Sequence, residues 1–307
     1  MTGSFDVARW SGVFTALVTP FRDGRIDFDA FDALVEGQLA AGVRGLVPVG
    51  TTGEAATLSS DEATALIART VRLAAGRALV VAGAGGNDTV HTVDKVRAAE
   101  AAGADAVLVV TPYYNKPSQA GLVAHYETVA AATGLPVMLY SVPGRTGVEI
   151  AADTCARLLE TSANIRVIKE AGGSVERVTK LRAACGDDLV VHSGDDGLTL
   201  PFLALGAVGV TSVVSNLVPD RVVALVAAWA RGDRAEALRL HEGLADLTAA
   251  MFVETNPTPV KAALALAGRI GGELRLPLVP VAPASRERIR AAMIRDGLLP
   301  VASGRAA

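Results

Sequence analysis

The feature that most constrains this 307-residue chain is a repeated alternation of short apolar runs with longer stretches of helical periodicity. Within the longer stretches, apolar residues recur at i, i+3, i+4 and i+7, which is typical of helices that cover a core. Neighbouring parallel strands need long crossover connections, and helices supply them, so this order predicts a parallel sheet. The expected strands are Val13–Thr19, Gly45–Gly50, Leu79–Gly83, Ala106–Thr111, Pro136–Val142, Arg166–Lys169, Leu189–Ser193 and Gly209–Ser212.

Eight such strands favour an α/β fold in which the sheet closes on itself, the (β/α)8 TIM barrel. An open, doubly wound sheet is the competing fold. Its phosphate loop would be Gly83–Asp88, but that segment lacks the third glycine of the dinucleotide fingerprint. The expected barrel helices include Phe28–Ala41, Ser60–Ala75, Thr89–Ala102, Gln119–Thr133 and Ser174–Ala184.

The alternation stops after Ser215, where helical stretches follow one another without strands between them. We therefore predict a barrel with the catalytic site in residues 1–218 and a C-terminal helical annex, packed on the barrel, in residues 219–307. No segment of disordered composition separates the two. The expected annex helices are Arg221–Arg231, Asp233–Met251, Val260–Ala267 and Ser285–Asp296.

Composition excludes several classes of protein. A net charge of −3 lacks the basic excess of a nucleic-acid binder. No uncharged apolar run reaches about 18 residues, so we expect no membrane span, and no basic start precedes a long apolar run as in a secretory signal. The two cysteines, Cys155 and Cys185, are expected to be thiols in a reducing compartment. We expect a cytoplasmic protein that binds neither nucleic acid nor membrane.

Lys169 ends the β-branched run that starts at Ile165, which reads as a buried strand. A buried ammonium is costly unless it is paired or its pKa falls. A lysine amine can attack a carbonyl and form a Schiff base, which an arginine cannot do. The plain alternative is a strand-end lysine that reaches solvent or pairs with Glu170. The chain has four other lysines, all in amphipathic or loop-like stretches: Lys95, Lys116, Lys180 and Lys261.

Polar side chains follow the expected strands at the edge where a barrel of this kind carries its catalytic groups. The hydroxyls of Thr51, Tyr114 and Tyr140 could pass protons through carbinolamine, imine and enamine. Thr51 and Thr52, with the small Gly53, could offer side-chain and backbone donors to a carboxylate. Each feature alone is typical of packing or of a turn. Their common position at strand ends favours a lysine-based aldolase.

Arg145 follows the fifth expected strand and could grip a second carboxylate in a bidentate fork. Other chemistries have less support. The four histidines show no zinc-type spacing, and His192–Asp195 lacks the strand–elbow–helix context of a hydrolase. The pair Asp195–Asp196 could bind Mg²⁺ in principle, but dedicated sites usually need further carboxylates or phosphates. We therefore predict no metal site.

Taken together, these segments resemble the dihydrodipicolinate synthase/N-acetylneuraminate lyase family of class I, pyruvate-dependent aldolases. The resemblance extends from about Gly12 to Leu299. Two annex segments, Phe252–Lys261 and Leu274–Pro277, are similar to the synthase branch in particular. The other matching segments are Gly50–Glu54, Thr111–Asn115, Tyr140–Thr146, Ile168–Ala171 and Ser193–Asp196.

The resemblance implies a catalytic role for four residues. Lys169 would form an imine with pyruvate, and Tyr140 would shuttle protons beside it. Thr51 and Tyr114 would complete the proton relay, with Tyr114 entering from a neighbouring subunit. The implied assembly is a homotetramer built as a dimer of dimers. No cofactor is implied beyond the covalent imine on Lys169.

The resemblance also implies the substrates. Thr52 would contact the pyruvate carboxylate, and Arg145 would bind the carboxylate of L-aspartate-4-semialdehyde. Condensation and cyclisation would give 4-hydroxy-tetrahydrodipicolinate, a precursor of diaminopimelate and lysine. Two residues depart from the family pattern, Ser141 where asparagine is frequent and Thr211 where a branched aliphatic residue is common. The expected substrate-binding residues are Thr52, Arg145, Gly53 and Thr211.

Two alternatives remain open. A relative of the same family could act on another aldehyde, belonging to a 2-keto-3-deoxy sugar acid, N-acetylneuraminate or the hydroxyproline pathway. A barrel of this kind could also be a non-catalytic binding protein. The presence of Lys169, Tyr140, Thr51 and Arg145 together argues against the second alternative.

Overall fold

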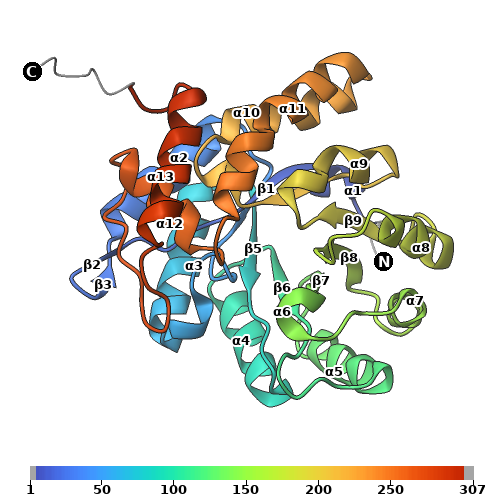
Figure 1. The fold of residues 1–307 in the computed structure, drawn as a ribbon. Helices are drawn as coiled ribbons and strands as arrows, with labels where there is room; N and C mark the ends of the chain where they lie inside the picture. The colour runs from blue at the N-terminus through green and yellow to red at the C-terminus, as the bar shows by residue number, and fades with distance from the viewer. Residues whose placement is uncertain (1–4, 301–307) are drawn as a thin grey trace, which may run out of the picture.

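The computed structural model describes residues 5–300 as a closed barrel of eight parallel strands surrounded by helices (Figure 1). Strand β1 (Gly12–Ala16) pairs with both β4 (Gly45–Val47) and β10 (Gly209–Ser212), so the sheet has no open edge. This closure confirms the predicted (β/α)8 barrel and excludes the open sheet. The remaining barrel strands are β5 (Leu79–Gly83), β6 (Ala106–Val110), β7 (Val137–Ser141), β8 (Ile165–Glu170) and β9 (Val190–Ser193).

Almost all residues of the barrel strands are buried, because both faces of the sheet are covered. In β7, Val137 and Leu139 belong to the core between strands and helices, whereas Met138 and Tyr140 belong to a second cluster inside the barrel. Successive side chains of a strand point to opposite faces, which explains this division. The strand register places Tyr140 directly beside Lys169 of β8.

The barrel helices begin close to where the sequence predicts them. Helix α3 (Ser60–Ala74) starts with a capping box in which Ser59 and Glu62 satisfy each other's backbone N–H groups. The other predicted helices of this layer are α2 (Phe28–Ala40), α4 (Thr89–Ala101), α5 (Gln119–Ala131) and α8 (Glu176–Cys185). The layer also contains α6 (Pro143–Thr146), α7 (Ala152–Thr161) and α9 (Thr199–Ala204), for which no range was predicted.

Three short elements before α2 were not predicted. They are helix α1 (Val7–Trp10) and the hairpin strands β2 (Phe21–Arg22) and β3 (Arg25–Ile26). Each is four residues or shorter, which is too short to show a periodicity of 3.6 or 2 residues.

The annex comprises helices α10 (Pro219–Ala230), α11 (Arg234–Met251), α12 (Thr258–Leu266) and α13 (Pro283–Arg295), coloured orange to red in Figure 1. Helix α10 contacts both β1 and α11, so the annex continues directly from the helical layer of the barrel. Cys155 and Cys185 are buried free thiols, as predicted. Among residues 5–300, no helix combines the length and the apolar character that crossing a membrane requires.

Candidate active site

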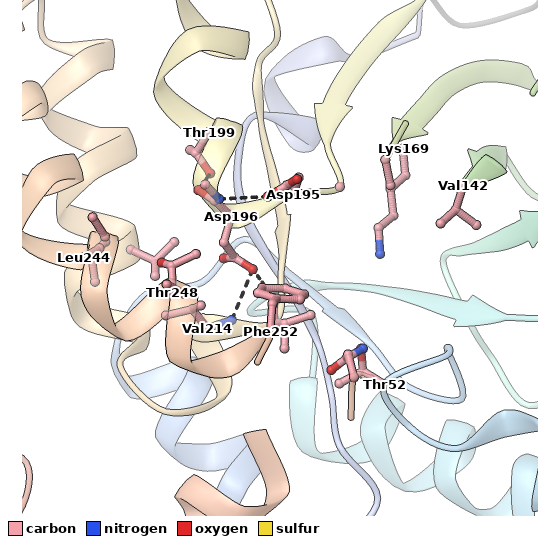
Figure 2. Close-up of a pocket in the computed structure, with 18 of the residues that line it drawn as sticks. Thr52, Val142, Lys169, Asp195, Asp196, Thr199, Val214, Leu244, Thr248 and Phe252 are labelled. Atoms are coloured by element: carbon pink, nitrogen blue, oxygen red, sulfur yellow. Dashed lines mark hydrogen bonds between the residues drawn. The ribbon is translucent and has the colours of Figure 1, made fainter. Parts of the chain in front are cut away.

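The ends of β7, β8 and β9 open into a cavity of about 550 Å³. The sequence-predicted residues Lys169, Tyr140, Thr52 and Arg145 all lie in its wall. Figure 2 shows the side chain of Lys169 extending into this space, with Val142 to its right and Thr52 below its tip in this view. Residues of α11 and the segment after it close the other side, among them Leu244, Thr248 and Phe252.

Lys169 is only 5% exposed. Its Nζ lies 4.3 Å from the centroid of the Tyr140 ring, a cation–π distance. Among residues 5–300, no side chain forms an ion pair or a hydrogen bond with this amine. Glu170 is fully buried and binds Nε of Arg177 at 3.1 Å instead, so the alternative of a Lys169–Glu170 pair is wrong. The amine is left facing the cavity without a fixed partner.

Tyr140 stands between two spaces. A second cavity, of about 330 Å³, is lined by Thr51 and shares Tyr140, Arg145 and Asn256 with the first. Lys169 lines the first cavity and Thr51 the second, with Tyr140 in the wall of both. The structure brings together three of the four residues predicted to be catalytic.

Tyr114 lies outside both cavities and is 89% exposed. Its φ of 72° is in the left-handed region, which is unfavourable for a bulky side chain and is often found at functional sites. The neighbouring Asn115 donates from Nδ2 to the carbonyl of Asn87 at 2.7 Å and so anchors the loop. A single chain does not bring Tyr114 to Lys169.

The turn after β4 explains the positions of Thr52 and Gly53. Thr52 is buried, and its Oγ1 accepts a hydrogen bond of 3.0 Å from Nδ2 of Asn256. The N–H of Gly53 donates to the carbonyl of Gly50, and the Gly53 carbonyl accepts from Oγ1 of Thr19. Gly53 lines neither cavity. Its backbone therefore serves the turn, in contrast to the expectation of a carboxylate donor.

Thr211 is fully buried inside the barrel and lines neither cavity. Nε2 of His192 lies 2.6 Å from the carbonyl oxygen of Trp10, so Nε2 carries the hydrogen. Nδ1 then accepts from the Thr211 hydroxyl at 3.2 Å. Burial lowers the pKa of His192 to about 4, which keeps the ring neutral. Thr211 thus orients a buried histidine, and its contact with substrate stays a prediction.

Arg145 is exposed and belongs to the walls of both cavities. Its Nη2 donates to the carbonyl of Asn256 at 3.0 Å. A guanidinium has five N–H donors in a planar fork, so most of them remain for a carboxylate. Asn256 comes from the annex and was missed as a site residue, although it lies in a quoted family segment. Its buried Oδ1 has no partner within residues 5–300.

Lys261 of α12 is also buried, although the sequence placed it in an amphipathic stretch. Its side chain is fully buried, with Nζ 2.5 Å from Oε1 of Glu54 and 2.9 Å from the carbonyl of Thr19. Burial lowers the pKa of Lys261, and the adjacent Glu54 carboxylate opposes that shift. The sequence around Lys261 reads as an ordinary amphipathic helix, because its partner is 207 positions away.

The Asp196 carboxylate is occupied by hydrogen bonds within the protein. The carboxylate is buried and accepts the backbone N–H groups of Val213 and Val214, at 2.9 and 3.3 Å, and the Ser212 hydroxyl; Figure 2 shows the Val214 contact. Burial raises the pKa of Asp196, while these hydrogen bonds lower it. In the part of the chain that the structure describes, no three His, Cys, Asp or Glu residues are grouped to hold a metal ion.

Comparison with known proteins agrees with this geometry. A sequence model of the dihydrodipicolinate synthetase family matches residues 9–295. The 4-hydroxy-tetrahydrodipicolinate synthase of Sorangium cellulosum is 51% identical over 287 residues, which cover 93% of this chain and 95% of that protein. The solved structure of the 4-hydroxy-tetrahydrodipicolinate synthase from Methylacidiphilum fumariolicum superposes with a TM-score of 0.92 at 47% identity, covering 94% of this chain and 96% of that one.

A structure described as the first monomeric dihydrodipicolinate synthase variant also superposes, with a TM-score of 0.92 at 43% identity. It covers 95% of this chain and 98% of its own. Matches of this length and identity include both the barrel and the annex. The chain therefore belongs to the dihydrodipicolinate synthetase family.

Proposed function

We propose that this protein is a Schiff-base aldolase that condenses pyruvate with L-aspartate-4-semialdehyde to give 4-hydroxy-tetrahydrodipicolinate, in the diaminopimelate and lysine pathway. The observation that carries the chemistry is the buried Lys169, which faces the cavity beside Tyr140 without an anionic partner in residues 5–300. The names of the similar proteins support the choice of substrates.

The amine of Lys169 attacks the ketone carbon of pyruvate and forms a carbinolamine. Loss of water gives the imine, and removal of a methyl proton gives the enamine that attacks the aldehyde. Imine formation and enamine formation both need a group that takes up and returns protons at the reacting atoms. Tyr140 lies next to Lys169, and Thr51 lines the second cavity, whose wall also includes Tyr140. These two hydroxyls are the proposed relay.

Two residues are proposed to bind the carboxylates. Thr52 Oγ1 already accepts a hydrogen bond from Asn256, so its own hydroxyl hydrogen is free to donate to pyruvate. Arg145 stands where the two cavities meet and would hold the carboxylate of the aldehyde substrate. The two carboxylates would thus bind at separate positions, that of pyruvate at the Thr52 hydroxyl and that of the aldehyde at the Arg145 guanidinium.

Tyr114 is proposed to act in a neighbouring subunit of a homotetramer, a dimer of dimers. An aromatic side chain that is 89% exposed on a strained backbone supports this proposal, because an isolated chain gives it nothing to pack against. One similar structure is of a monomeric variant, so the assembly state has to be measured directly.

Reductive trapping tests the proposed chemistry. Borohydride added in the presence of pyruvate should fix one pyruvate-derived group per chain on the peptide that contains Lys169. Lys169→Ala should abolish this labelling. Lys180→Ala is the matched control, because Lys180 is an exposed lysine whose ion pair is with Glu176, away from both cavities. Labelling that maps to another lysine, or that persists in Lys169→Ala, would refute the assignment.

A coupled assay with a panel of aldehydes tests the substrate. Turnover should be greatest with L-aspartate-4-semialdehyde. If trapping succeeds but a sugar-derived aldehyde is the better acceptor, the protein is a family member with another substrate.

A further inference from the structure

Lys261 and Glu54 form a buried ion pair next to the proposed site. Lys261 Nζ lies 2.5 Å from Glu54 Oε1, 2.9 Å from the Thr19 carbonyl and 4.5 Å from the Phe21 ring centroid. The second carboxylate oxygen of Glu54 accepts the backbone N–H of Arg275 at 3.0 Å. The charged atoms of both residues are therefore occupied by the protein and not reserved for a ligand.

Stability alone is a weak reason for this pair. Removing two charges from water is costly, and buried ion pairs can often be replaced by apolar residues without loss of stability. Burial indeed lowers the pKa of Lys261, which records this cost. What the pair does supply is a fixed position for both side chains, because a short charge-assisted hydrogen bond allows little movement of either partner.

Glu54 directly follows the turn that carries Thr51 and Thr52. Its φ of 56° is a left-handed conformation that non-glycine residues adopt only when their surroundings hold them there. Thr19 holds the same end of the turn, because its Oγ1 donates to the Gly53 carbonyl at 2.7 Å while its own carbonyl accepts from Lys261. The ion pair thus fixes the end of the turn.

The same annex segment also contacts the middle of the turn. Asn256 lies five positions before Lys261, and its Nδ2 donates to Thr52 Oγ1 at 3.0 Å. Its carbonyl accepts from Arg145 at 3.0 Å. Residues 256–261 therefore contact the turn at Thr52 and at Glu54, and they connect it to Arg145.

We propose that Lys261 and Glu54 are positioning residues that set the place of Thr52 relative to Lys169, and thereby the affinity of the site for the carboxylate of a 2-keto acid. This inference rests on the proposed function. Lys261 lines neither cavity and so acts only through Glu54 and the turn. Loss of the pair should weaken binding of the 2-keto acid and leave the later chemistry nearly intact.

The experiment compares full-length Glu54→Gln, Lys261→Met and wild type by borohydride trapping over a range of pyruvate concentrations. Turnover at saturating pyruvate and thermal melting are measured on the same samples. Arg221→Met is the control, because it breaks an ion pair between Arg221 and Asp296, neither of which lines a cavity. The two test variants should raise the half-saturating pyruvate concentration by about ten-fold, the effect of misplacing one charge-assisted hydrogen bond. The control should lower only the melting temperature.

An unchanged half-saturation, with only a lower melting temperature as in the control, overturns the proposal. If Lys261→Met does not fold because Glu54 is left unpaired, the double variant Glu54→Gln/Lys261→Met carries the test, since it has no buried charge at this position. A raised half-saturation in the double variant supports positioning, and a wild-type value refutes it. A wild-type protein that traps no pyruvate refutes the proposed function and this inference with it.

Discussion

Arg145→Ala is the sharpest test of how the aldehyde is selected. The side chain lies in the walls of both cavities, and within residues 5–300 its one hydrogen bond goes to the Asn256 carbonyl. If its remaining donors hold the substrate carboxylate, the substitution removes a charged, bidentate contact. The pyruvate half of the reaction, which depends on Lys169, should be spared.

The magnitude follows from the exposure of Arg145. Loss of a buried charge-pair contact costs about 2–5 kcal/mol. Because Arg145 is exposed, solvent screening places the expected cost at the lower end, about 2–3 kcal/mol. At about 1.4 kcal/mol per decade, kcat/KM for the aldehyde should fall by about 30- to 150-fold. Arg145→Lys should recover only part of this, because it keeps the charge without the fork.

The assay measures kcat/KM for the aldehyde at saturating pyruvate, alongside borohydride trapping of pyruvate. Arg286→Ala is a matched control, since Arg286 is an exposed arginine of α13 that lines neither cavity. If trapping falls in Arg145→Ala as much as condensation does, Arg145 is a pyruvate ligand or a structural residue, and the reasoning fails.

Three further predictions concern the assembly and the stability of the fold. Mixing inactive Tyr114→Phe and Lys169→Ala chains should restore activity if one mixed site regains both groups; no recovery despite demonstrated subunit exchange would place Tyr114 in its own chain's site. The hydrogen bond from Arg275 lowers the pKa of Glu62 from 4.5 to about 2. The stabilisation is therefore present above about pH 4.5 and lost as the pH falls toward 2, so Glu62→Gln should flatten the acid limb of unfolding free energy; an unchanged limb contradicts this. Asp196→Asn turns an acceptor into a donor among N–H groups and should cost about 1–3 kcal/mol in denaturant unfolding, whereas a neutral effect would mean that the loop rearranges.

Much of the fold could be predicted from local sequence. All eight barrel strands and the annex helices were expected near their observed positions. Periodicity and helix caps depend on residues that are close in sequence, so they can be recognised locally. The short hairpin of β2 and β3 was missed for the same reason, since two-residue strands show no pattern.

The site was predicted in part. Lys169, Tyr140, Thr51, Thr52 and Arg145 meet at two adjoining cavities because the ends of parallel strands in a closed barrel lie on one face. The same rule could not tell which strand-end residues face the cavity. Gly53 and Thr211 satisfy the turn and His192 instead.

The sequence by itself determined the barrel, the lysine near the end of β8 that is proposed as the nucleophile, and the order of the polar groups around it. Only the tertiary structure decided that Asn256 touches Thr52 across 204 positions and that Lys261 meets Glu54 across 207. The physical reason is range. Periodicity and capping depend on neighbours within a turn of the chain, whereas the partner of a buried polar group is set by where the closed barrel places the annex helix against it.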